Sequence, residues 1–163
     1  MKFLTKEKSK DMLIPTVYIS VGVPGSGKTF WWKQSIEHGV IPEKKTMYIN
    51  PEEQAKNLAL SGDVTISIAN SYSMSLYKNS LSVQLPLIYF DGYFITTKTR
   101  APIIEEAKKV GYKVICLWFD QDIEICKNRK PDLKEKIDIV DSYIKKEPPS
   151  LEEGFDSIWQ IKK

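Results

Sequence analysis

The fold is decided by residues 22–29, which read Gly22-Val23-Pro24-Gly25-Ser26-Gly27-Lys28-Thr29. This segment fits the pattern G-x-x-x-x-G-K-[ST], which is typical of the phosphate-binding loop (P-loop) of nucleoside-triphosphate enzymes. The β-branched and aromatic segment 16–21 precedes it and is typical of a buried strand. The segment 30–37 follows it and is typical of the start of a helix. The motif therefore lies in the strand–loop–helix context that a P-loop requires.

The residue types of this loop account for its expected chemistry. Glycines allow backbone N–H groups to close around phosphate oxygens, where a β-carbon would crowd the ligand. The helix N-terminus adds N–H groups and the positive end of a dipole. We expect Lys28 to reach the β- and γ-phosphates of ATP and the Thr29 hydroxyl to bind Mg²⁺. The expected nucleotide contacts are Gly22, Pro24, Gly25, Ser26, Gly27, Lys28, Thr29 and Phe30.

Strands and helices alternate along the rest of the chain. Apolar and β-branched runs predict strands at 16–21, 46–50, 86–91, 113–119 and 157–161. Helices are predicted at 28–38, from Pro51 to the turn at 61–63, and at 97–110, 121–130 and 134–146. Asn50 is expected to cap the helix that begins at Pro51. Residues 64–83 stay open, because Val64–Ile68 fits a strand whereas 70–84 fits a surface helix or a lid.

This alternation predicts an α/β fold with a central parallel sheet covered by helices on both faces. Together with the loop, it indicates a P-loop NTPase of the kinase type. We expect a flexible N-terminal arm at residues 1–12 and a single kinase domain at 13–163. Ligands bind at the carboxyl ends of the strands in such sheets. The P-loop, Asn50 and Asp91 all follow strands and are therefore expected to converge on one cleft.

Composition and charge are those of an ordinary globular protein of 163 residues. The net charge of +3 permits a polyanionic partner without requiring one. Cys116 and Cys126 are too few for a disulfide framework, so reduced thiols and a cytoplasmic location are expected. The segment 1–10 lacks the apolar core of a signal peptide, and the apolar run 12–23 is too short to span a bilayer. We therefore expect no association with membranes.

Acidic residues that follow two of the strands are candidates for catalysis. Asp91 could hold Mg²⁺ or accept the proton of an attacking hydroxyl, or it could simply cap the turn that follows. Glu52 and Glu53 lie in the first turn of a predicted helix, where acidic residues also stabilise the helix dipole. A phosphoryl-transfer enzyme needs a carboxylate that orients the acceptor hydroxyl. Glu52 and Asp91 are therefore both candidates for the general base.

Arg100 and Arg129 are the only arginines among 24 basic residues. A planar guanidinium that cannot deprotonate suits a phosphate better than an ammonium group does. Arg129 precedes Pro131, and we expect it to close over the ATP phosphates from a lid at residues 126–136. Arg100 lies early in the helix beyond Asp91 and is a second catalytic candidate. Either arginine could instead be an ordinary surface residue.

Several segments resemble the polynucleotide 5′-hydroxyl kinase family, which occurs in bacteriophages and in DNA- and RNA-repair enzymes. Residues 21–31 are similar to the opening of that family, Tyr48-Ile49-Asn50 to its second strand and Ile88-Tyr89-Phe90-Asp91 to its third. Residues 147–159 contain Pro149, Glu153, Gly154 and Phe155 and resemble the family's Pro-x-x-x-Glu-Gly-Phe tail. The likeness extends over residues 16–161. The tail and the order of elements are more specific than the P-loop, which many unrelated kinases share.

The resemblance implies an ATP- and Mg²⁺-dependent kinase that phosphorylates 5′-hydroxyl ends of DNA or RNA. It implies that Glu52, after the second strand, is the catalytic base, and that Arg100 matches an arginine that follows the third strand. The sequence departs from the family on the acceptor side. Asn50-Pro51-Glu52 stands for Asn-Arg-Asp, Ala55 and Lys56 lie where an arginine holds the acceptor phosphate, and Gly92-Tyr93-Phe94 stands for Asn-Thr-Asn.

Two other interpretations remain open. One is a kinase of a small hydroxylated metabolite or nucleotide sugar, which Ala55 and Phe94 favour because fewer phosphate-gripping groups face the acceptor. The other is a nucleotide-binding module without catalysis, in which Trp31, Trp32, Tyr93 and Phe94 form a contact surface rather than core. The sequence has no Asn-Lys-x-Asp guanine motif, which argues against a GTPase and favours adenine.

Overall fold

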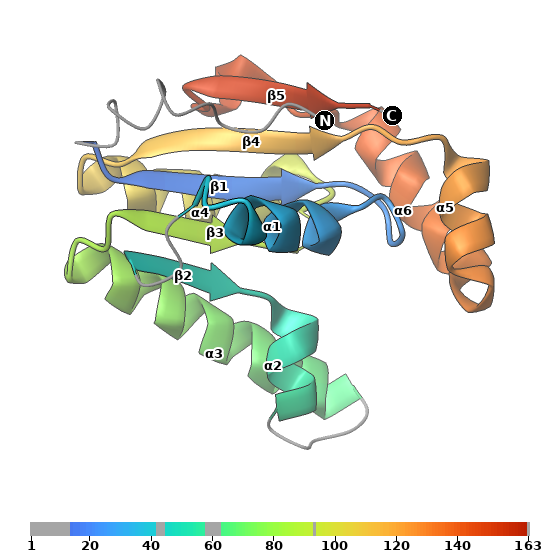
Figure 1. Cartoon of the computed structure of the whole chain (residues 1–163), viewed down its shortest axis with the longest axis horizontal. Helices are drawn as coiled ribbons and strands as arrows, with labels where there is room; N and C mark the ends of the chain where they lie inside the picture. The colour runs from blue at the N-terminus through green and yellow to red at the C-terminus, as the bar shows by residue number, and fades with distance from the viewer. Residues whose placement is uncertain (1–13, 42–44, 58–62, 93, 163) are drawn as a thin grey trace.

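The computed structural model describes residues 14–41, 45–57, 63–92 and 94–162, and these form a five-stranded sheet with helices (Figure 1). The strands are β1 (Thr16–Val21), β2 (Thr46–Ile49), β3 (Leu87–Phe90), β4 (Lys113–Phe119) and β5 (Ser157–Ile161). The α-helices are α1 (Lys28–Glu37), α2 (Pro51–Asn57), α3 (Asp63–Ser82), α4 (Thr97–Lys109), α5 (Ile123–Arg129) and α6 (Lys134–Lys146). Short 3₁₀ helices are η3 (Pro131–Leu133) and η4 (Leu151–Glu153). The arm expected at residues 1–12 lies outside the described residues.

All neighbouring strands of the sheet are parallel, in the order β2–β3–β1–β4–β5. The central strand β1 pairs Thr16 with Leu87 of β3 and with Lys113 of β4. Because parallel strands end at the same edge of a sheet, the segments that follow them meet there, at the right in Figure 1. The predicted α/β class with a central parallel sheet is confirmed.

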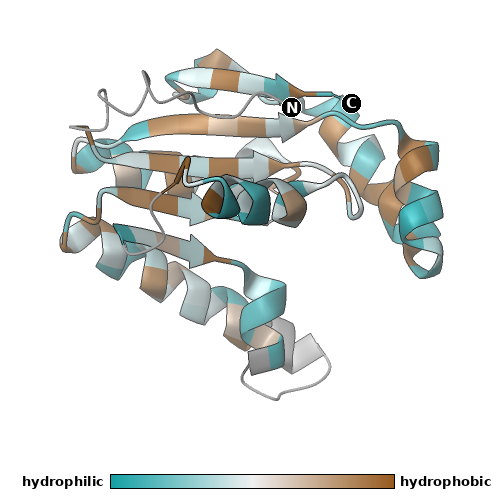
Figure 2. Ribbon diagram, in the orientation of Figure 1, coloured by the Kyte–Doolittle hydropathy of each residue, from teal (hydrophilic) through white to brown (hydrophobic). Residues whose placement is uncertain are grey.

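Helices cover both faces of the sheet, as predicted. On one face, Tyr77 of α3, Ile103 of α4 and Ile137 of α6 pack into one core cluster and are at most 2% exposed. On the other face, Trp31 of α1 is fully buried, and Trp32 packs beside it. The two tryptophans therefore belong to the core rather than to a contact surface. Figure 2 shows hydrophobic residues along the strands and hydrophilic ones on α2.

A row of tyrosines crosses the sheet on the face that α1 covers. Tyr89 of β3 lies opposite Tyr18 of β1 and Tyr48 of β2 in the strand register. The rings of Tyr48 and Tyr89 are stacked with centroids 5.7 Å apart, and Trp32 of α1 stacks on Tyr48 at 5.0 Å. Aromatic pairs of this kind contribute about 0.5–1.5 kcal/mol each beyond their burial. The row therefore helps to fix α1, and with it the end of the P-loop, against β2 and β3.

Residues 63–82 form the helix α3, so the alternative strand at Val64–Ile68 is wrong. The helix buries Ala69, Ser73, Tyr77 and Leu81, which recur every four residues and so share one face. A short run of β-branched residues fits both periodicities, and packing along the whole segment decides between them. None of the helices in the described residues, α3 included, combines the length and the apolarity that crossing a bilayer requires.

Side-chain caps begin the helices that follow β2 and β4. The Asn50 Oδ1 accepts a hydrogen bond from the Glu52 N–H at 3.0 Å, so the predicted cap of α2 is confirmed. Asp122 caps α5 by accepting from the Glu124 N–H at 2.7 Å. The helix predicted at 121–130 therefore begins later, at Ile123.

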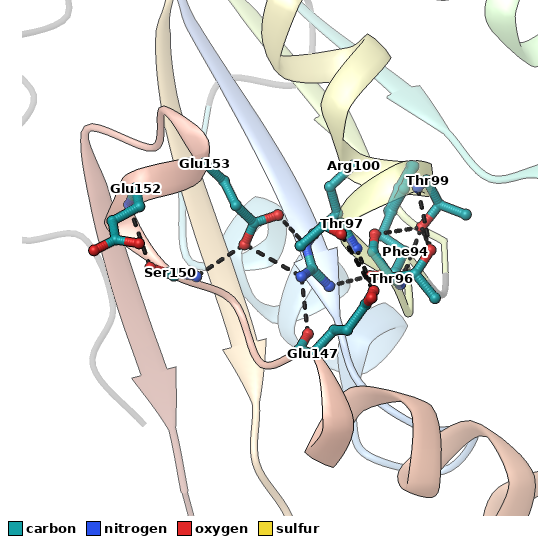
Figure 3. A network of polar contacts seen from close by, with 9 residues as sticks. All are labelled: Phe94, Thr96, Thr97, Thr99, Arg100, Glu147, Ser150, Glu152 and Glu153. Atoms are coloured by element: carbon teal, nitrogen blue, oxygen red, sulfur yellow. Dashed lines mark hydrogen bonds and ion pairs between the residues drawn. The ribbon is translucent and has the colours of Figure 1, made fainter.

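The C-terminal segment fastens α4 to the rest of the fold (Figure 3). Arg100 of α4 is fully buried, and its Nε and Nη2 donate to the Glu153 carboxylate at 2.7 and 3.2 Å. Its Nη1 donates to the Phe94 carbonyl at 2.9 Å and its Nη2 to the Glu147 carbonyl at 2.8 Å. Gly154 follows with a φ of +109°, a conformation that favours glycine. Glu153 and Gly154 of the tail motif thus help to hold α4 in place.

Candidate functional site

The P-loop joins the buried strand β1 to α1 at the carboxyl edge of the sheet. Lys28 is the first residue of α1, and its Nζ donates to the carbonyls of Gly22 and Val23 at 2.9 and 3.0 Å. Burial lowers the pKa of Lys28, and the negative charges of Asp91 and Glu52 oppose that lowering. The hydrogen bonds to Gly22 and Val23 hold the ammonium group inside the loop, where it would meet a bound phosphate.

The loop offers an anion both space and polar groups. Gly25 has a φ of +81°, and a Cβ there would lie 2.9 Å from the Cys126 carbonyl, so the position requires glycine. A Cβ on Gly27 would meet nothing within 4 Å, which leaves open space beside the helix N-terminus. The Ser26 Oγ is buried and has no hydrogen-bond partner among the described residues. A buried hydroxyl of this kind calls for a partner, and a phosphate oxygen would supply one.

Asp91 lies directly beyond β3 and is 2% exposed. Its Oδ2 accepts hydrogen bonds from the Thr29 hydroxyl at 3.1 Å and from the Tyr48 hydroxyl at 2.6 Å. Its Oδ1 accepts from the Ser20 hydroxyl at 2.9 Å, and the Asn50 amide lies 3.4 Å from Oδ2. Side chains from β1, from α1 and from the end of β2 therefore converge on one carboxylate, which does far more than cap a turn.

Thr29 and Asp91 are in contact, and a threonine of the loop together with a nearby aspartate is the pair that holds Mg²⁺ in P-loop enzymes. Among the residues that the structure describes, no group of three or more His, Cys, Asp or Glu side chains could hold a metal by itself. Mg²⁺ suits such a place, because it is commonly bound through one or two carboxylates together with the phosphates of a substrate. The donor set therefore fits a Mg²⁺ ion that arrives with ATP.

Arg129 ends α5 and reaches back to the P-loop. Its Nη1 donates to the Gly25 carbonyl at 3.0 Å, and its exposed side chain lines the same cavity as the loop. Lys130 lines the cavity beside it. The structure thus brings a guanidinium group to the place where the phosphates of ATP are expected, on the segment that was predicted to form a lid.

Glu52 lies in the first turn of α2 and lines the cavity from the opposite side. Its Oε1 is 3.6 Å from the Nζ of Lys136 on α6, so an ion pair spans the space between the two helices. The side chains of Glu52 and Lys136 are 61% and 47% exposed, and solvent makes pairs of this kind weak. The pair therefore contributes little to holding the two helices together.

A cavity of ≈ 1510 Å³ extends along the carboxyl edge of the sheet, with residues 24–30 of the P-loop in its middle. On the side of β4 and β5 it is lined by Phe119, Gln121, Ile161 and Lys162. On the side of β3 and β2 it is lined by Tyr48, Asn50, Glu52, Glu53, Ala55, Lys56, Asn70, Met74, Asp91, Phe94, Ile95, Thr99, Pro102 and Ile103, among others. Single ligand pockets measure roughly 300–1,000 Å³, so this one has room for a nucleotide and a second substrate.

Arg100 is not among the side chains that line this cavity. Its guanidinium is turned toward Glu153 and the carbonyls of Phe94 and Glu147 instead (Figure 3). The structure therefore does not bring Arg100 to the other catalytic candidates, contrary to the expectation from its position in the sequence. An arginine early in the helix after Asp91 could serve either purpose, and only the position of the C-terminal segment decides. Tyr93, which the sequence analysis considered as a contact residue, lies outside the described residues.

Ser20 and Tyr48 contact Asp91 although no role was predicted for them. Ser20 is a small hydroxyl residue next to the end of a buried strand, and an isolated polar residue in such a place is a signal that could have identified it. Tyr48 stands two residues before Asn50, as Tyr89 does before Asp91. No local pattern identifies the role of Tyr48, since its contact depends on the pairing of β2 with β3.

Comparison with known proteins yields matches among solved structures. No family model and no curated protein matches the chain. A chain of the PezAT chromosomal toxin–antitoxin system of Streptococcus pneumoniae has a TM-score of 0.67 at 18% identity, over 99% of this chain and 80% of that one. A chain of the Pnkp1/Rnl/Hen1 RNA repair complex has a TM-score of 0.67 at 15% identity, over 88% of this chain and 47% of that one. Shikimate kinase from Acinetobacter baumannii has a TM-score of 0.57 at 16% identity, over 95% of this chain and 88% of that one.

These similarities establish the fold. The chain has a P-loop NTPase fold of the kinase type, as the sequence predicts. At such low identities the fold alone is shared. The neighbours include a shikimate kinase in complex with shikimate and a chain of an RNA repair complex, so the fold by itself does not identify a substrate.

Proposed function

We propose that this protein is an ATP-dependent kinase that transfers the γ-phosphoryl group of ATP to a hydroxyl group. The observation that carries the proposal is the arrangement of Lys28, Thr29 and Asp91 at the ends of β1 and β3, where Thr29 contacts Asp91. A cation for the phosphates and a hydroxyl–carboxylate pair for Mg²⁺ are thus placed together at a helix N-terminus. A glycine-rich turn with a purely structural role would need none of these contacts.

On the donor side, the N–H groups of the P-loop and the Lys28 ammonium bind the β- and γ-phosphates. Thr29 and Asp91 hold Mg²⁺, which when bound neutralises part of the charge on the phosphates. Ser26 offers a further hydroxyl inside the loop. Arg129, on α5, is placed to contact the phosphoryl group as it is transferred and to stabilise the charge that develops on it.

On the acceptor side, Glu52 is the better candidate for the general base. Both oxygens of Asp91 already accept hydrogen bonds from hydroxyl groups, which leaves this carboxylate poorly placed to take a proton from a substrate. Glu52 instead has an exposed carboxylate on the side of the cavity next to β2 and β3. We call this side the acceptor end, because we propose that the acceptor binds there. The resemblance to polynucleotide kinases also implies a base at this position. We therefore assign Asp91 to the metal and Glu52 to the acceptor hydroxyl.

The first acceptor that we propose is a 5′-hydroxyl end of DNA or RNA. The family resemblance supports it, as does the similarity in fold to a chain of an RNA repair complex. Lysine side chains from several elements line the cavity and could contact backbone phosphates: Lys33, Lys56, Lys130 and Lys136.

A small uncharged molecule with a hydroxyl group is the second candidate, and the positions of the two arginines favour it. Arg100 is held by Glu153, and Arg129 contacts the P-loop, so neither is placed to bind a phosphate of the acceptor. The acceptor end of the cavity also carries apolar side chains, among them Met74, Phe94 and Ile103. A wall of this kind suits a substrate with an uncharged body.

Transfer of label from γ-labelled ATP distinguishes these acceptors. The protein is incubated with Mg²⁺, labelled ATP and either a 5′-hydroxyl oligonucleotide or a panel of nucleosides and small polyols. Label on the oligonucleotide, with an acceptor KM that rises steeply with salt, supports the polynucleotide acceptor. Label on a small molecule, with a KM that is insensitive to salt, supports the second candidate. Lys28→Ala should abolish either transfer, and a protein that binds ATP but labels no acceptor would contradict the kinase proposal.

Glu52→Gln tests the assignment of the base. General-base catalysis contributes about 10²–10⁴-fold, so kcat should fall by a factor in this range while ATP binding is retained. Glu53→Gln is the matched control, because Glu53 occupies the next position of the same helix turn and also lines the cavity. Its kcat should stay close to that of the unmodified protein. An unchanged kcat in Glu52→Gln would place the base elsewhere.

A further inference from the structure

We infer that Tyr48 is a positioning residue that couples the metal side of the active site to its acceptor side. The Tyr48 hydroxyl stands between Asp91, which we assign to Mg²⁺, and Asn50, which caps the helix that carries Glu52. Coupling of this kind has meaning only within the kinase function proposed above, on which it rests.

A continuous path of hydrogen bonds runs through the Tyr48 hydroxyl. The hydroxyl donates to the Asp91 Oδ2 at 2.6 Å and accepts from the Asn50 Nδ2 at 3.1 Å. The Asn50 Oδ1 in turn accepts from the N–H groups of Glu52 and Glu53 at 3.0 and 3.2 Å. The path therefore leads from the carboxylate on the metal side to the first turn of the helix that bears the candidate base.

Packing and strand pairing together fix the direction in which this hydroxyl points. The Tyr48 ring stacks on Trp32 at 5.0 Å and 18° and on Tyr89 at 5.7 Å and 23°. Tyr48 also pairs with Tyr89 in the sheet, and the Asp91 N–H donates to the Ile49 carbonyl at 2.7 Å, which extends the pairing of β2 with β3 to the site. The contact is thus preorganised, because neither the ring nor the backbone has freedom to lose when it forms.

The hydroxyl acts in this arrangement as a protonated donor. A tyrosine hydroxyl carries its proton at neutral pH, and the Asp91 Oδ2, at 2.6 Å, is the acceptor for it. A phenylalanine would preserve the stacking with Trp32 and Tyr89 and would delete only the hydroxyl. Ring packing alone therefore gives no reason for a tyrosine at this position, whereas the contacts with Asp91 and Asn50 do.

Loss of the hydroxyl should loosen both ends of the path. A misplacement of about 1 Å at a reacting group can cost roughly 10²-fold, and we expect Tyr48→Phe to lower kcat about 10- to 100-fold. The concentration of Mg²⁺ needed for half-maximal ATP binding should rise several-fold, because Asp91 loses its shortest hydrogen bond. ATP binding at saturating Mg²⁺ should be retained, since the P-loop itself is unchanged.

The experiment uses two readouts and a matched control. The first readout is ATP binding by calorimetry over a range of Mg²⁺ concentrations, which needs neither an acceptor nor turnover. The second is kcat and the acceptor KM. Tyr112→Phe is the control, because it also removes a tyrosine hydroxyl that makes a short hydrogen bond, here to the Leu85 carbonyl at 2.7 Å. Tyr112 is buried and is not among the residues that line the cavity. This variant should keep the unmodified protein's Mg²⁺ dependence and kcat.

A double variant tests the coupling itself. If Tyr48 acts through the base, the cost of Tyr48→Phe in kcat should shrink when Glu52 is already glutamine, because the two residues then share one effect. Costs that simply multiply, equal losses in Tyr48→Phe and Tyr112→Phe, or an unchanged Mg²⁺ dependence in Tyr48→Phe would each overturn the inference. If the unmodified protein binds Mg²⁺ and ATP but labels no acceptor, the kinase proposal fails, and the binding readout still decides whether Tyr48 positions Asp91.

Discussion

Arg100 and Asp91 are both buried charged side chains, 0% and 2% exposed, but their surroundings differ. Arg100 faces the Glu153 carboxylate and two backbone carbonyls, which together match its charge and its N–H groups. Asp91 accepts hydrogen bonds from three hydroxyl groups and an amide, none of which carries a charge. We call the contacts of Arg100 the closed network, because the Glu153 carboxylate supplies the opposite charge. We call the contacts of Asp91 the open network, because its hydrogen-bond donors are all neutral.

This difference separates a charge that holds the fold from a charge that serves a ligand. A buried ion pair cancels its own charge, and its removal on one side leaves the other side unpaired. A carboxylate among neutral donors keeps its charge in a buried place, which is costly unless a cation comes to it. Burial lowers the pKa of Lys28, and Asp91 is the first of the charges that oppose this, so the field of Asp91 already reaches the P-loop. The surroundings of Asp91 therefore fit the proposed role of this carboxylate in holding Mg²⁺.

The largest effect is expected for Arg100→Met, which removes the cation of the closed network and should lower the unfolding free energy. The variant leaves Glu153, whose side chain is 11% exposed, without its partner, and breaking a largely buried pair in this way costs about 3–5 kcal/mol of unfolding free energy. Chemical denaturation followed by circular dichroism measures it. The double variant Arg100→Met/Glu153→Gln should regain part of the loss, because it removes the orphaned charge and keeps an oxygen for the Ser150 N–H. If Arg100→Met alone is as stable as the unmodified protein but transfers no phosphate, Arg100 is a catalytic residue. The difference that we infer between Arg100 and Asp91 would then be wrong.

The second-largest effect is expected for Asp91→Asn, which removes the anion of the open network and should lower the rate of phosphoryl transfer. Removing a preorganised charge at a reacting centre costs about 10²–10³-fold in rate, so phosphoryl transfer should fall by that factor. The unfolding free energy should change little, because the relief of a buried charge opposes the loss of an acceptor for the surrounding hydroxyl groups. Asp120→Asn is the matched control, since Asp120 follows β4 as Asp91 follows β3, and it pairs with Lys162 at 3.3 Å. If Asp91→Asn unfolds the protein instead, Asp91 is a structural charge like Arg100.

The donor half of the site was predictable because its residues are close in the sequence. Lys28 and Thr29 belong to one short motif whose spacing is dictated by how a backbone wraps a phosphate. Asn50 and Asp91 could be placed beside that motif because strands of a parallel sheet end at the same edge. Neither inference requires knowledge of which strands are neighbours. The structure confirms the cap at Asn50, and it brings Asp91 into contact with Thr29.

The roles of Arg100 and Tyr48 could not be predicted, because each depends on elements that only the folded chain brings together. Arg100 meets Glu153 across 53 residues of sequence, and Tyr48 meets Asp91 across 43. The tail motif is instructive in the same way. Its Glu153 holds α4, so the part of the sequence that most specifically resembles polynucleotide kinases supports the architecture and carries no information about the acceptor.

The smallest effect is expected for Asp156, which follows the tail motif and connects the end of α4 to the start of β4. Its Oδ2 accepts from the Lys108 Nζ and, at 2.7 Å, from the Val114 N–H. Burial tends to raise the pKa of Asp156, but these hydrogen bonds outweigh it, and the pKa is lowered. A carboxyl group whose pKa is lower in the folded state stabilises the fold above its unfolded pKa of about 3.9. That contribution is lost as the pH falls through the folded value.

Asp156→Asn should therefore cost less than about 1 kcal/mol at pH 7, because the side chains of Lys108 and Asp156 are 38% and 37% exposed and solvent weakens their pair. The unmodified protein should lose stability as the pH falls below about 4, and the variant should lose less over the same range, since it has no carboxyl group to protonate at this position. Denaturation curves at pH 7 and pH 3 measure both quantities, and Glu152→Gln, an exposed carboxylate of the same tail, should retain the pH dependence of the unmodified protein. If Asp156→Asn lowers the unfolding free energy at pH 7 as much as Arg100→Met does, the ion pair of Arg100 is not the main contact that holds the C-terminal segment. That segment would then fold as one unit, and Asp91 would have to be compared with the whole segment rather than with the single charge of Arg100.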